Sequence, residues 1–145
     1  MRTTTNQKSN RTIIFISISI VLSMILIGIL CFVKTTGYGT GLYTRFSQAS
    51  TEQHWQLNGG QALTAGSFVR NAPISGGAEA LTIDSSCAVG SLILRIGQGE
   101  KEELIDISNA NGLVVPLDGF SSTQDIKLAV EHSKASDFQF DVSWE

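Results

Sequence analysis

Cysteine and histidine are scarce in this sequence, with two residues of each among 145. A metal site normally needs three or four ligands from Cys, His, Asp or Glu at a recognisable spacing. His54, His132 and Cys87 lie far apart and form no such motif. A G-x-S-x-G nucleophile motif is also absent. We therefore predict no catalytic residue, no metal and no cofactor, and we expect both histidines at the surface or at strand edges.

Acidic residues offer two alternative sites. Glu102, Glu103 and Asp106 could act as paired carboxylates. Lys101 beside them and the turn before them instead favour the solvated start of a strand. Three acids in predicted loops could bind calcium through oxygen ligands, although no D-x-D-x-D-G motif occurs. These three are Asp84, Asp118 and Asp125.

The two cysteines cannot form a disulfide with each other, because Cys31 lies in a long apolar run and Cys87 lies far beyond it. The chain therefore relies on its core rather than on disulfides. We interpret Cys87 as a small apolar residue beside a turn. Pairing of Cys87 with a second molecule is the alternative.

Acidic residues are absent from the first 45 positions, which carry five basic residues. Residues 46–145 carry thirteen acids and five bases, so the two parts have net charges of +5 and −8. A domain with a charge of −8 is repelled by the phosphates of nucleic acid, and we predict no nucleic-acid partner.

Residues 13–33 are 21 uncharged and mostly apolar residues in succession. A helix of that length is about 30 Å long, which matches the hydrocarbon thickness of a bilayer. We predict a transmembrane helix that contacts the lipid bilayer. Its anchor residues include Ile13, Phe15, Leu22, Ile27 and Phe32.

Three alternatives to a retained anchor fit the sequence less well. A signal peptide has a shorter apolar core and a small-residue cleavage site, and the end of this run lacks an A-x-A pattern. A bacterial lipoprotein needs a small residue before its cysteine, whereas Leu30 precedes Cys31. The glycine and glutamate typical of type IV pilins are also missing at the start of the run.

The flanking charges predict the orientation of the helix. Arg2, Lys8 and Arg11 precede it, whereas only Lys34 and Arg45 follow it closely. Basic residues are retained on the cytoplasmic side, which places residues 1–12 in the cytoplasm and the C-terminal part outside the cell membrane. No N-x-S/T sequon follows the run, which fits a bacterial envelope.

Ser19 and Ser23 are four residues apart and share one helix face. Small side chains at this spacing allow a second helix to approach closely, so this is a candidate packing face. Alternatively, each hydroxyl bonds a backbone carbonyl one turn earlier.

After the membrane run, residues 34–50 are rich in Gly, Thr and Ser, and we predict a juxtamembrane linker there. Residues 51–145 alternate apolar and polar side chains, with turn signals about every 8–14 residues. This pattern predicts a single antiparallel β-sandwich of about eight strands. The predicted strands are Gln53–Leu57, Ala62–Arg70, Ala78–Asp84, Ser91–Ile96, Glu103–Ser108, Leu113–Leu117, Asp125–His132 and Asp137–Trp144. A tight connection at Ala135 and Ser136 predicts that the last two strands form a hairpin.

Residues 90–96 have the sequence G-S-L-I-L-R-I, and residues 138–144 have the sequence F-Q-F-D-V-S-W. This order of strands resembles small jelly-roll modules at the C-termini of bacterial secreted and membrane-anchored proteins, related in shape to pre-peptidase C-terminal and CUB-type domains. The terminal strand departs from their pattern, because Ala135-Ser136-Asp137 stands where a glycine is usual. The resemblance implies a binding or structural role.

The sequence thus predicts a single-pass envelope protein with an extracellular, jelly-roll-like and non-catalytic binding or accessory module. We expect a protein partner in or at the membrane, and no small-molecule ligand can be named. A structural subunit of a larger membrane complex is the alternative.

Overall fold

The computed structural model describes residues 17–27, 38–74 and 76–145. By its internal contacts the chain divides into two units, Met1–Lys34 and Thr35–Glu145.

In the first unit, residues 17–27 form an α-helix that lies within the predicted span of 13–33. Among the described residues, no helix is both long enough and apolar enough to cross a membrane. Three of the predicted anchor residues, Ile13, Phe15 and Phe32, lie outside the described residues.

The second unit is all β, with nine antiparallel strands among its described residues. Each of the eight predicted strands overlaps an observed strand, and the last two are the two halves of β9. The strands are β1 Tyr38–Gly39, β2 Ser47–Thr51, β3 His54–Gln61, β4 Gly66–Ala72, β5 Ala80–Ser86, β6 Val89–Gln98, β7 Lys101–Asp106, β8 Asn109–Pro116 and β9 Ile126–Trp144.

Strands β1 and β2 lie in the segment predicted to be a linker, and that prediction is wrong for residues 38–50. Strand β1 pairs with β4, strand β2 pairs with β3, and Tyr43 between them bridges to Ala62. The segment shows little apolar alternation, and its backbone is ordered by pairing with the free edges of two stronger strands. The β domain therefore includes residues from Tyr38 onward and does not start at residue 51.

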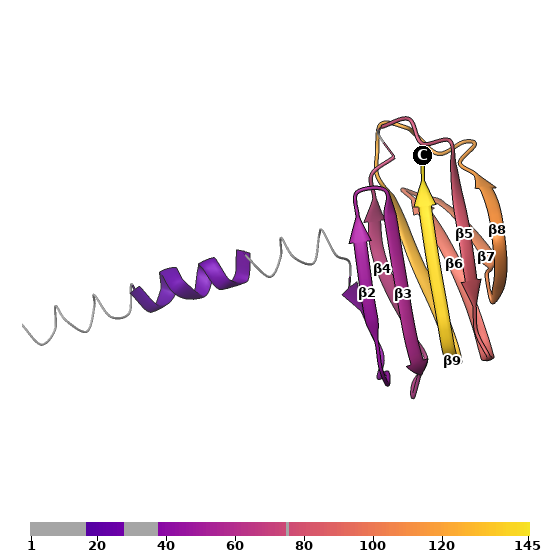
Figure 1. Ribbon diagram of the computed structural model, residues 1–145. Helices are drawn as coiled ribbons and strands as arrows, with labels where there is room; N and C mark the ends of the chain where they lie inside the picture. Colours follow the sequence, from indigo (N-terminus) through magenta and orange to yellow (C-terminus); the bar gives the residue numbers. More distant parts are fainter. Residues whose placement is uncertain (1–16, 28–37, 75) are drawn as a thin grey trace, which may run out of the picture. The chain divides into compact units, whose positions relative to one another are not determined.

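Strand β9 is 19 residues long and is the centre of the sheet, because it is paired on both sides along most of its length (Figure 1). Its first half pairs with β4 and β6. Its second half pairs with β3 and β5. The outer strands extend the sheet, with β1 beside β4, β2 beside β3, β7 beside β6 and β8 beside β5.

The sheet folds over along one line that runs across its paired strands. We call this line the corner. On β9 the corner lies at 134–137, where Lys134 and Asp137 have positive φ angles of 52° and 45°. At the same level, the strand paired with β9 changes on both sides. On one side β3 ends and β4 begins at residues 62–65, and on the other β5 ends and β6 begins at residues 87–88. Figure 1 shows the two halves of β9 running in opposite directions, one behind the other.

The fold-over produces two facing layers. Layer A contains β1, β4, the first half of β9, β6 and β7, whereas layer B contains β2, β3, the second half of β9, β5 and β8. Alternate side chains of β9 point between the layers, so that Leu128 and Val130 from layer A and Phe140 and Val142 from layer B are all buried. The Trp55 ring packs edge-on against Phe140, with ring centres 5.5 Å apart.

The predicted hairpin of the last two strands is wrong in its pairing. The tight connection at Ala135 and Ser136 exists, but the two halves of β9 bond to neighbouring strands and not to each other. Their apolar side chains therefore meet across the core instead of side by side.

Gly90 offers a test of the corner. A β-carbon at this position would lie 2.4 Å from the carbonyl oxygen of Ser133, and the φ angle of Gly90 is +90°. We expect Gly90→Ala to lower the free energy of unfolding by about 2 kcal/mol, because a backbone clash adds to a strained conformation. The measurement is chemical denaturation of the chain. Gly97→Ala is the matched control, because its β-carbon meets only atoms at 3.9 Å or more. Equal stability of the two variants would contradict the corner geometry.

Candidate functional site

The outer face of layer A carries a hollow of about 390 Å³, which we call the groove. It crosses four neighbouring strands, β4, β9, β6 and β7. Small or short side chains form its floor, and long charged side chains form its walls. The floor residues are Ser67, Val69, Gly97 and Ala129, and the wall residues are Arg95, Glu102, Lys127 and Glu131.

The pairing register explains why the groove is hollow. Ala129 at the centre of β9 lies between Val69 on β4 and Arg95 on β6. One pair further along, Gly97 lies between Lys127 and Glu102. Side chains of the same parity point to the same face of a sheet, so small residues in the middle leave space among longer neighbours.

Arg95 connects two walls of the groove. Its Nε donates to Glu131 Oε1 at 2.8 Å, and its Nη1 contacts Glu102 Oε1 at 2.8 Å. The hydrogen bonds that Arg95 donates to Glu102 and Glu131 raise its pKa above the usual value. All three side chains are between 36% and 50% exposed, so these ion pairs are screened by water and contribute little stability. A ligand could therefore displace them at a small cost.

The groove combines charged and apolar surface, which suits binding. Two basic and two acidic side chains make it neutral as a whole, and its floor offers apolar surface at Val69 and Ala129. Among the described residues, the ammonium group of Lys127 forms no hydrogen bond or ion pair, so it can contact a partner. The groove contains no cysteine or histidine that could act as a nucleophile or general base.

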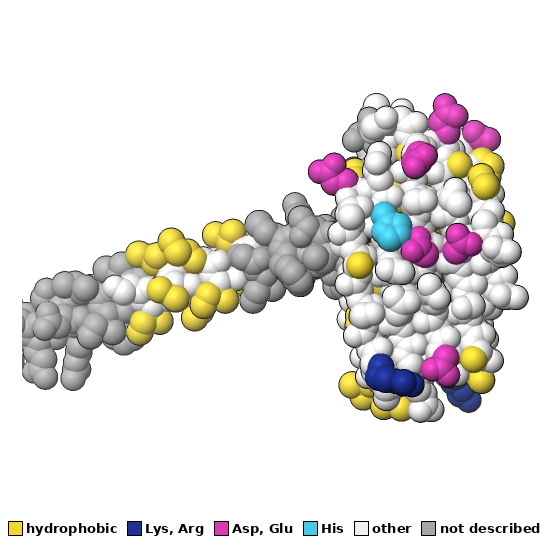
Figure 2. Space-filling view, in the orientation of Figure 1, with side chains coloured by type: hydrophobic (Ala, Val, Ile, Leu, Met, Phe, Trp, Pro, Cys, Tyr) yellow, Lys and Arg dark blue, Asp and Glu magenta, His cyan; other side chains and the backbone are white. Residues whose placement is uncertain are grey.

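The outer face of layer B carries a second polar group. His54 Nε2 lies 2.8 Å from Asp141 Oδ1, and both side chains are about one-third exposed. Asp84 lies opposite Asp141 in the ladder but accepts a hydrogen bond from the Gly112 amide at 2.7 Å. Figure 2 shows a histidine beside acidic side chains on this face. Ser143 lies opposite His54 in the pairing of β3 with β9, but within the described residues no hydroxyl forms a hydrogen bond with the His54 ring.

His132 is buried near the corner, and the expectation that it lies at the surface is wrong. Its Nε2 lies 2.6 Å from the Tyr43 hydroxyl, and the Tyr43 hydroxyl also donates to the carbonyl oxygen of Thr40. The rings of Phe68 and Phe138 pack on both partners. The position of His132 on the inner face of β9 follows from the alternation that buries Leu128 and Val130.

The hydrogen bonds of Tyr43 indicate which nitrogen of His132 carries its proton. Because the Tyr43 hydroxyl proton is used by Thr40, Nε2 of His132 donates to the Tyr43 oxygen. Nδ1 is then a bare acceptor, and it has no partner among the described residues. Burial lowers the pKa of His132, because protonation would place a second N–H group in a site without an acceptor.

The other candidate residues do not gather into a site. Glu102 and Glu103 are neighbours in β7 and point to opposite faces, so they form no carboxylate pair. Asp106 accepts hydrogen bonds from the backbone amide and hydroxyl of Ser108, which lower its pKa. Burial and Asp106 raise the pKa of the Cys87 thiol, which disfavours its reactive thiolate.

Among the described residues, no three Cys, His, Asp or Glu side chains are placed to hold a metal ion. The three acids considered for calcium therefore lie apart from any such cluster. They are Asp84 in β5, and Asp118 and Asp125 in the connection from β8 to β9.

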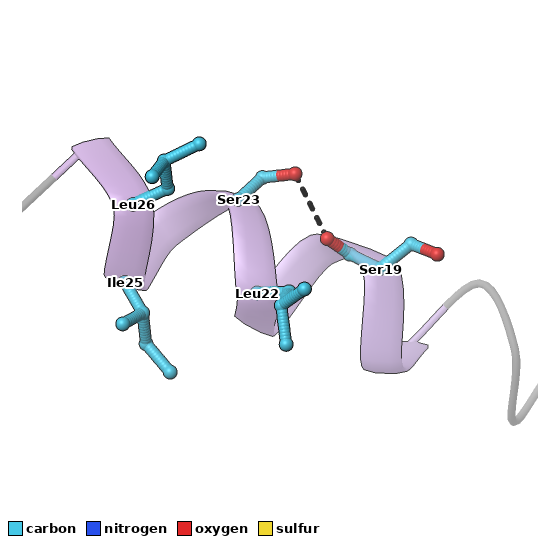
Figure 3. A pocket seen from close by; sticks show the side chains of 5 residues that line it. All are labelled: Ser19, Leu22, Ser23, Ile25 and Leu26. Carbon is cyan, nitrogen blue, oxygen red and sulfur yellow. Dashed lines mark hydrogen bonds between the residues drawn. The ribbon is translucent and has the colours of Figure 1, made fainter.

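On the helix of the first unit, Ser19 and Ser23 share a face with Leu22 and Leu26 (Figure 3). The Ser23 hydroxyl donates to the backbone carbonyl of Ser19 at 2.8 Å. This is the internal hydrogen bond expected of a serine in an apolar helix. Ser19 and Ser23 thus provide two small side chains one turn apart, flanked by Leu22 and Leu26, and this spacing favours the approach of another helix.

The groove was not predicted from the sequence. Charged residues at Arg95, Lys127 and Glu131 do alternate with apolar ones, which indicates a wet face on each strand. Their meeting depends on the pairing of β6 with β9, and alternation within a strand carries no information about its partners.

His132 provides a pH-dependent test of this description. Its pKa is lower in the folded chain than the usual value of about 6.5, so the unfolded chain binds the proton more readily. Stability should therefore fall as the pH is lowered from about 7.5 to about 5.5. Thermal melts should show that His132→Gln weakens this dependence, whereas His54→Gln retains it. An unchanged pH dependence in His132→Gln would contradict the buried neutral imidazole.

No protein-family model matches this chain, and no curated protein matches it either.

Proposed function

We propose that this chain is a single-pass protein of a bacterial cell membrane, with a non-catalytic binding or accessory module outside the cell. Residues 1–12 would lie in the cytoplasm and residues 13–33 in the bilayer. The β domain, from Tyr38 onward, would contact a protein partner in or at the membrane.

The observation that supports the proposed membrane anchor is an apolar helix whose large side chains are exposed. Eight large apolar side chains within residues 17–27 are between 51% and 67% exposed. Successive residues are rotated by about 100°, so these side chains surround the helix. A helix that is apolar over most of its surface, apart from the small side chains of Ser19 and Ser23, favours an apolar environment, such as a protein core or lipid. The side chains are Ile18, Ile20, Val21, Leu22, Met24, Ile25, Leu26 and Ile27.

The β domain has the opposite character, with thirteen acids and six bases in residues 38–145 and a net charge of −7. Its folded-over sheet supports the finer proposal of a β-sandwich of the jelly-roll kind. In such sandwiches, strands pass from one layer to the other at bends, as they do at the corner here. The proposed likeness to pre-peptidase C-terminal or CUB-type modules rests on this arrangement and on residues 90–96 and 138–144.

The groove is the surface through which we propose that the domain binds. It combines an apolar floor with donors and acceptors on its walls, which is the usual composition of a specific contact surface. Opening the ion pairs of Arg95 would release one guanidinium and two carboxylates for a partner.

A structural subunit of a larger membrane complex is the second candidate, because the face of Ser19 and Ser23 is small enough for another helix. In this case Ser19→Leu with Ser23→Leu should release a stoichiometric membrane partner from the chain in mild detergent. For a groove-binding module, the same change should leave the complex intact.

Topology labelling tests the anchor. In intact cells, a cysteine-reactive reagent that cannot cross membranes should modify Ser122→Cys and spare Thr4→Cys, both made in a chain whose native cysteines are replaced. Ser122 is exposed in the connection that precedes β9. The chain should also stay in the membrane pellet after alkaline extraction. Modification of position 4 alone would overturn the orientation, and release of the chain by alkali would overturn the anchor.

Site-specific photo-crosslinking tests the groove. A photoreactive residue in place of Lys127 should give one discrete adduct in intact cells, and the same residue in place of Thr82 on layer B should give none. Gly97→Val should reduce the adduct about tenfold or more, because filling the floor removes more than about 1.4 kcal/mol of contact. The β-carbon at position 97 is accommodated, so an unchanged melting temperature would show that the variant folds. An undiminished adduct would contradict the groove as binding surface.

A further inference from the structure

Exposed apolar side chains of the β domain gather at the corner. Six large apolar residues of the domain are at least 40% exposed. Two of them, Leu104 and Val114, lie on the outer strands β7 and β8. The other four lie at or next to the corner: Leu42, Phe46, Leu63 and Val89.

The pairing places these corner residues in one row. The amide of Leu63 donates to the carbonyl of Leu42 at 2.8 Å. Next to them, Ala62 bonds Ala135 on β9, and on the other side of β9 Val89 lies opposite Ser136. The row thus crosses from the β1–β2 connection to the start of β6.

The two ends of the domain differ in charge. Arg45 and Lys134 are exposed at the corner, where the acids are Asp137 and, at the end of β7 beside Cys87, Asp106. Arg45 Nη2 lies 3.8 Å from Asp137 Oδ1 and its side chain is 84% exposed, so this pair leaves the guanidinium available. Figure 2 shows the basic side chains of this face at the lower end of the domain, beside apolar ones and one acidic one, whereas several acidic side chains lie at the upper end.

The opposite end consists of the connections that link the strands away from the corner. These connections carry five acids. Lys101, the first residue of β7, follows the connection from β6 and adds a basic residue to this end. The acids are Glu52, Glu79, Glu100, Asp118 and Asp125. An anionic or zwitterionic lipid surface therefore repels this end or leaves it in water.

The chain between the predicted span and the domain is short. The span ends at Val33 and β1 begins at Tyr38. Five residue steps reach at most about 18 Å, even when fully extended. A half-strand of about seven residues is about 23 Å long, so this connection is shorter than one layer of the domain.

We propose that the corner docks onto the headgroup region of the bilayer that holds the helix, an inference that rests on the proposed membrane anchor. Leu42, Leu63 and Val89 contribute apolar surface to the interface. Arg45 and Lys134 contact lipid phosphates, as basic residues beside apolar ones do at membrane surfaces. The strands then stand away from the membrane, and the groove on layer A faces sideways, where a neighbouring membrane protein can reach it.

A fluorescent reporter in the full-length chain tests this orientation. With the native cysteines replaced, an environment-sensitive nitrobenzoxadiazole label is attached at Leu63→Cys or, as the control, at Val114→Cys, which is equally exposed on layer B. Both chains are reconstituted in vesicles of phosphatidylcholine and phosphatidylglycerol. We expect a blue-shifted emission and quenching by spin-labelled lipid at position 63, and neither effect at position 114.

Charge reversal gives the second measurement. Arg45→Glu with Lys134→Glu should reduce the quenching at position 63, whereas Lys101→Glu at the acidic end should not. Equal signals at positions 63 and 114 in chains that float with the vesicles would overturn the docking and leave the anchor intact. A chain that does not float would overturn the anchor, and the docking with it. A blue shift in detergent that grows with protein concentration would show that the corner contacts a second copy of the chain and not lipid.

Discussion

The backbone hydrogen bonds of β9 hold the β domain together, and its other features depend on them. A strand paired on both sides along most of its length connects β3 and β4 on one flank to β5 and β6 on the other. When this central strand reverses at the corner, its neighbours reverse with it, because each must keep its register. Two facing layers follow, and with them a single core lined by alternate residues of every long strand.

The same register creates the outer surfaces. Residues between the buried positions of β9 point outward, so Lys127, Ala129 and Glu131 lie beside the outward residues of β4 and β6. Charged side chains surround the small residues Ala129 and Gly97, and the hollow between them is the groove. The half-exposed ion pairs of Arg95 keep the groove neutral and adaptable. The core and the groove are therefore formed by the inward and outward side chains of the same paired strands. A shift of the pairing register by one residue would exchange these two sets of side chains.

The aromatic contacts at the corner show how a weakly patterned segment becomes part of a fold. Residues 38–46 have little alternation of their own, yet Tyr43 packs against Phe68 and bonds buried His132. Both rings stay neutral, because burial lowers the pKa of His132 and raises that of Tyr43. The first strands are thus held by side chains from distant parts of the sequence. Local pattern recognition could not identify them. The expectation that His132 lies at the surface came from its residue type, whereas the alternation of β9 places it inside.

The sequence by itself determined the class of the second unit, the approximate position of eight strands and most of the buried residues, such as Leu128, Phe140 and Val142. These are local properties, because alternation with a period of two requires only that one face of a strand be apolar. The separation of charge and the apolar run of 13–33 are equally visible in the chain. Tertiary structure alone decided that the halves of β9 face each other rather than pair, that Arg95 meets Glu131, and that Leu42, Leu63 and Val89 share an edge. Each of these depends on which strands become neighbours, and that choice is made by the packing of the whole core.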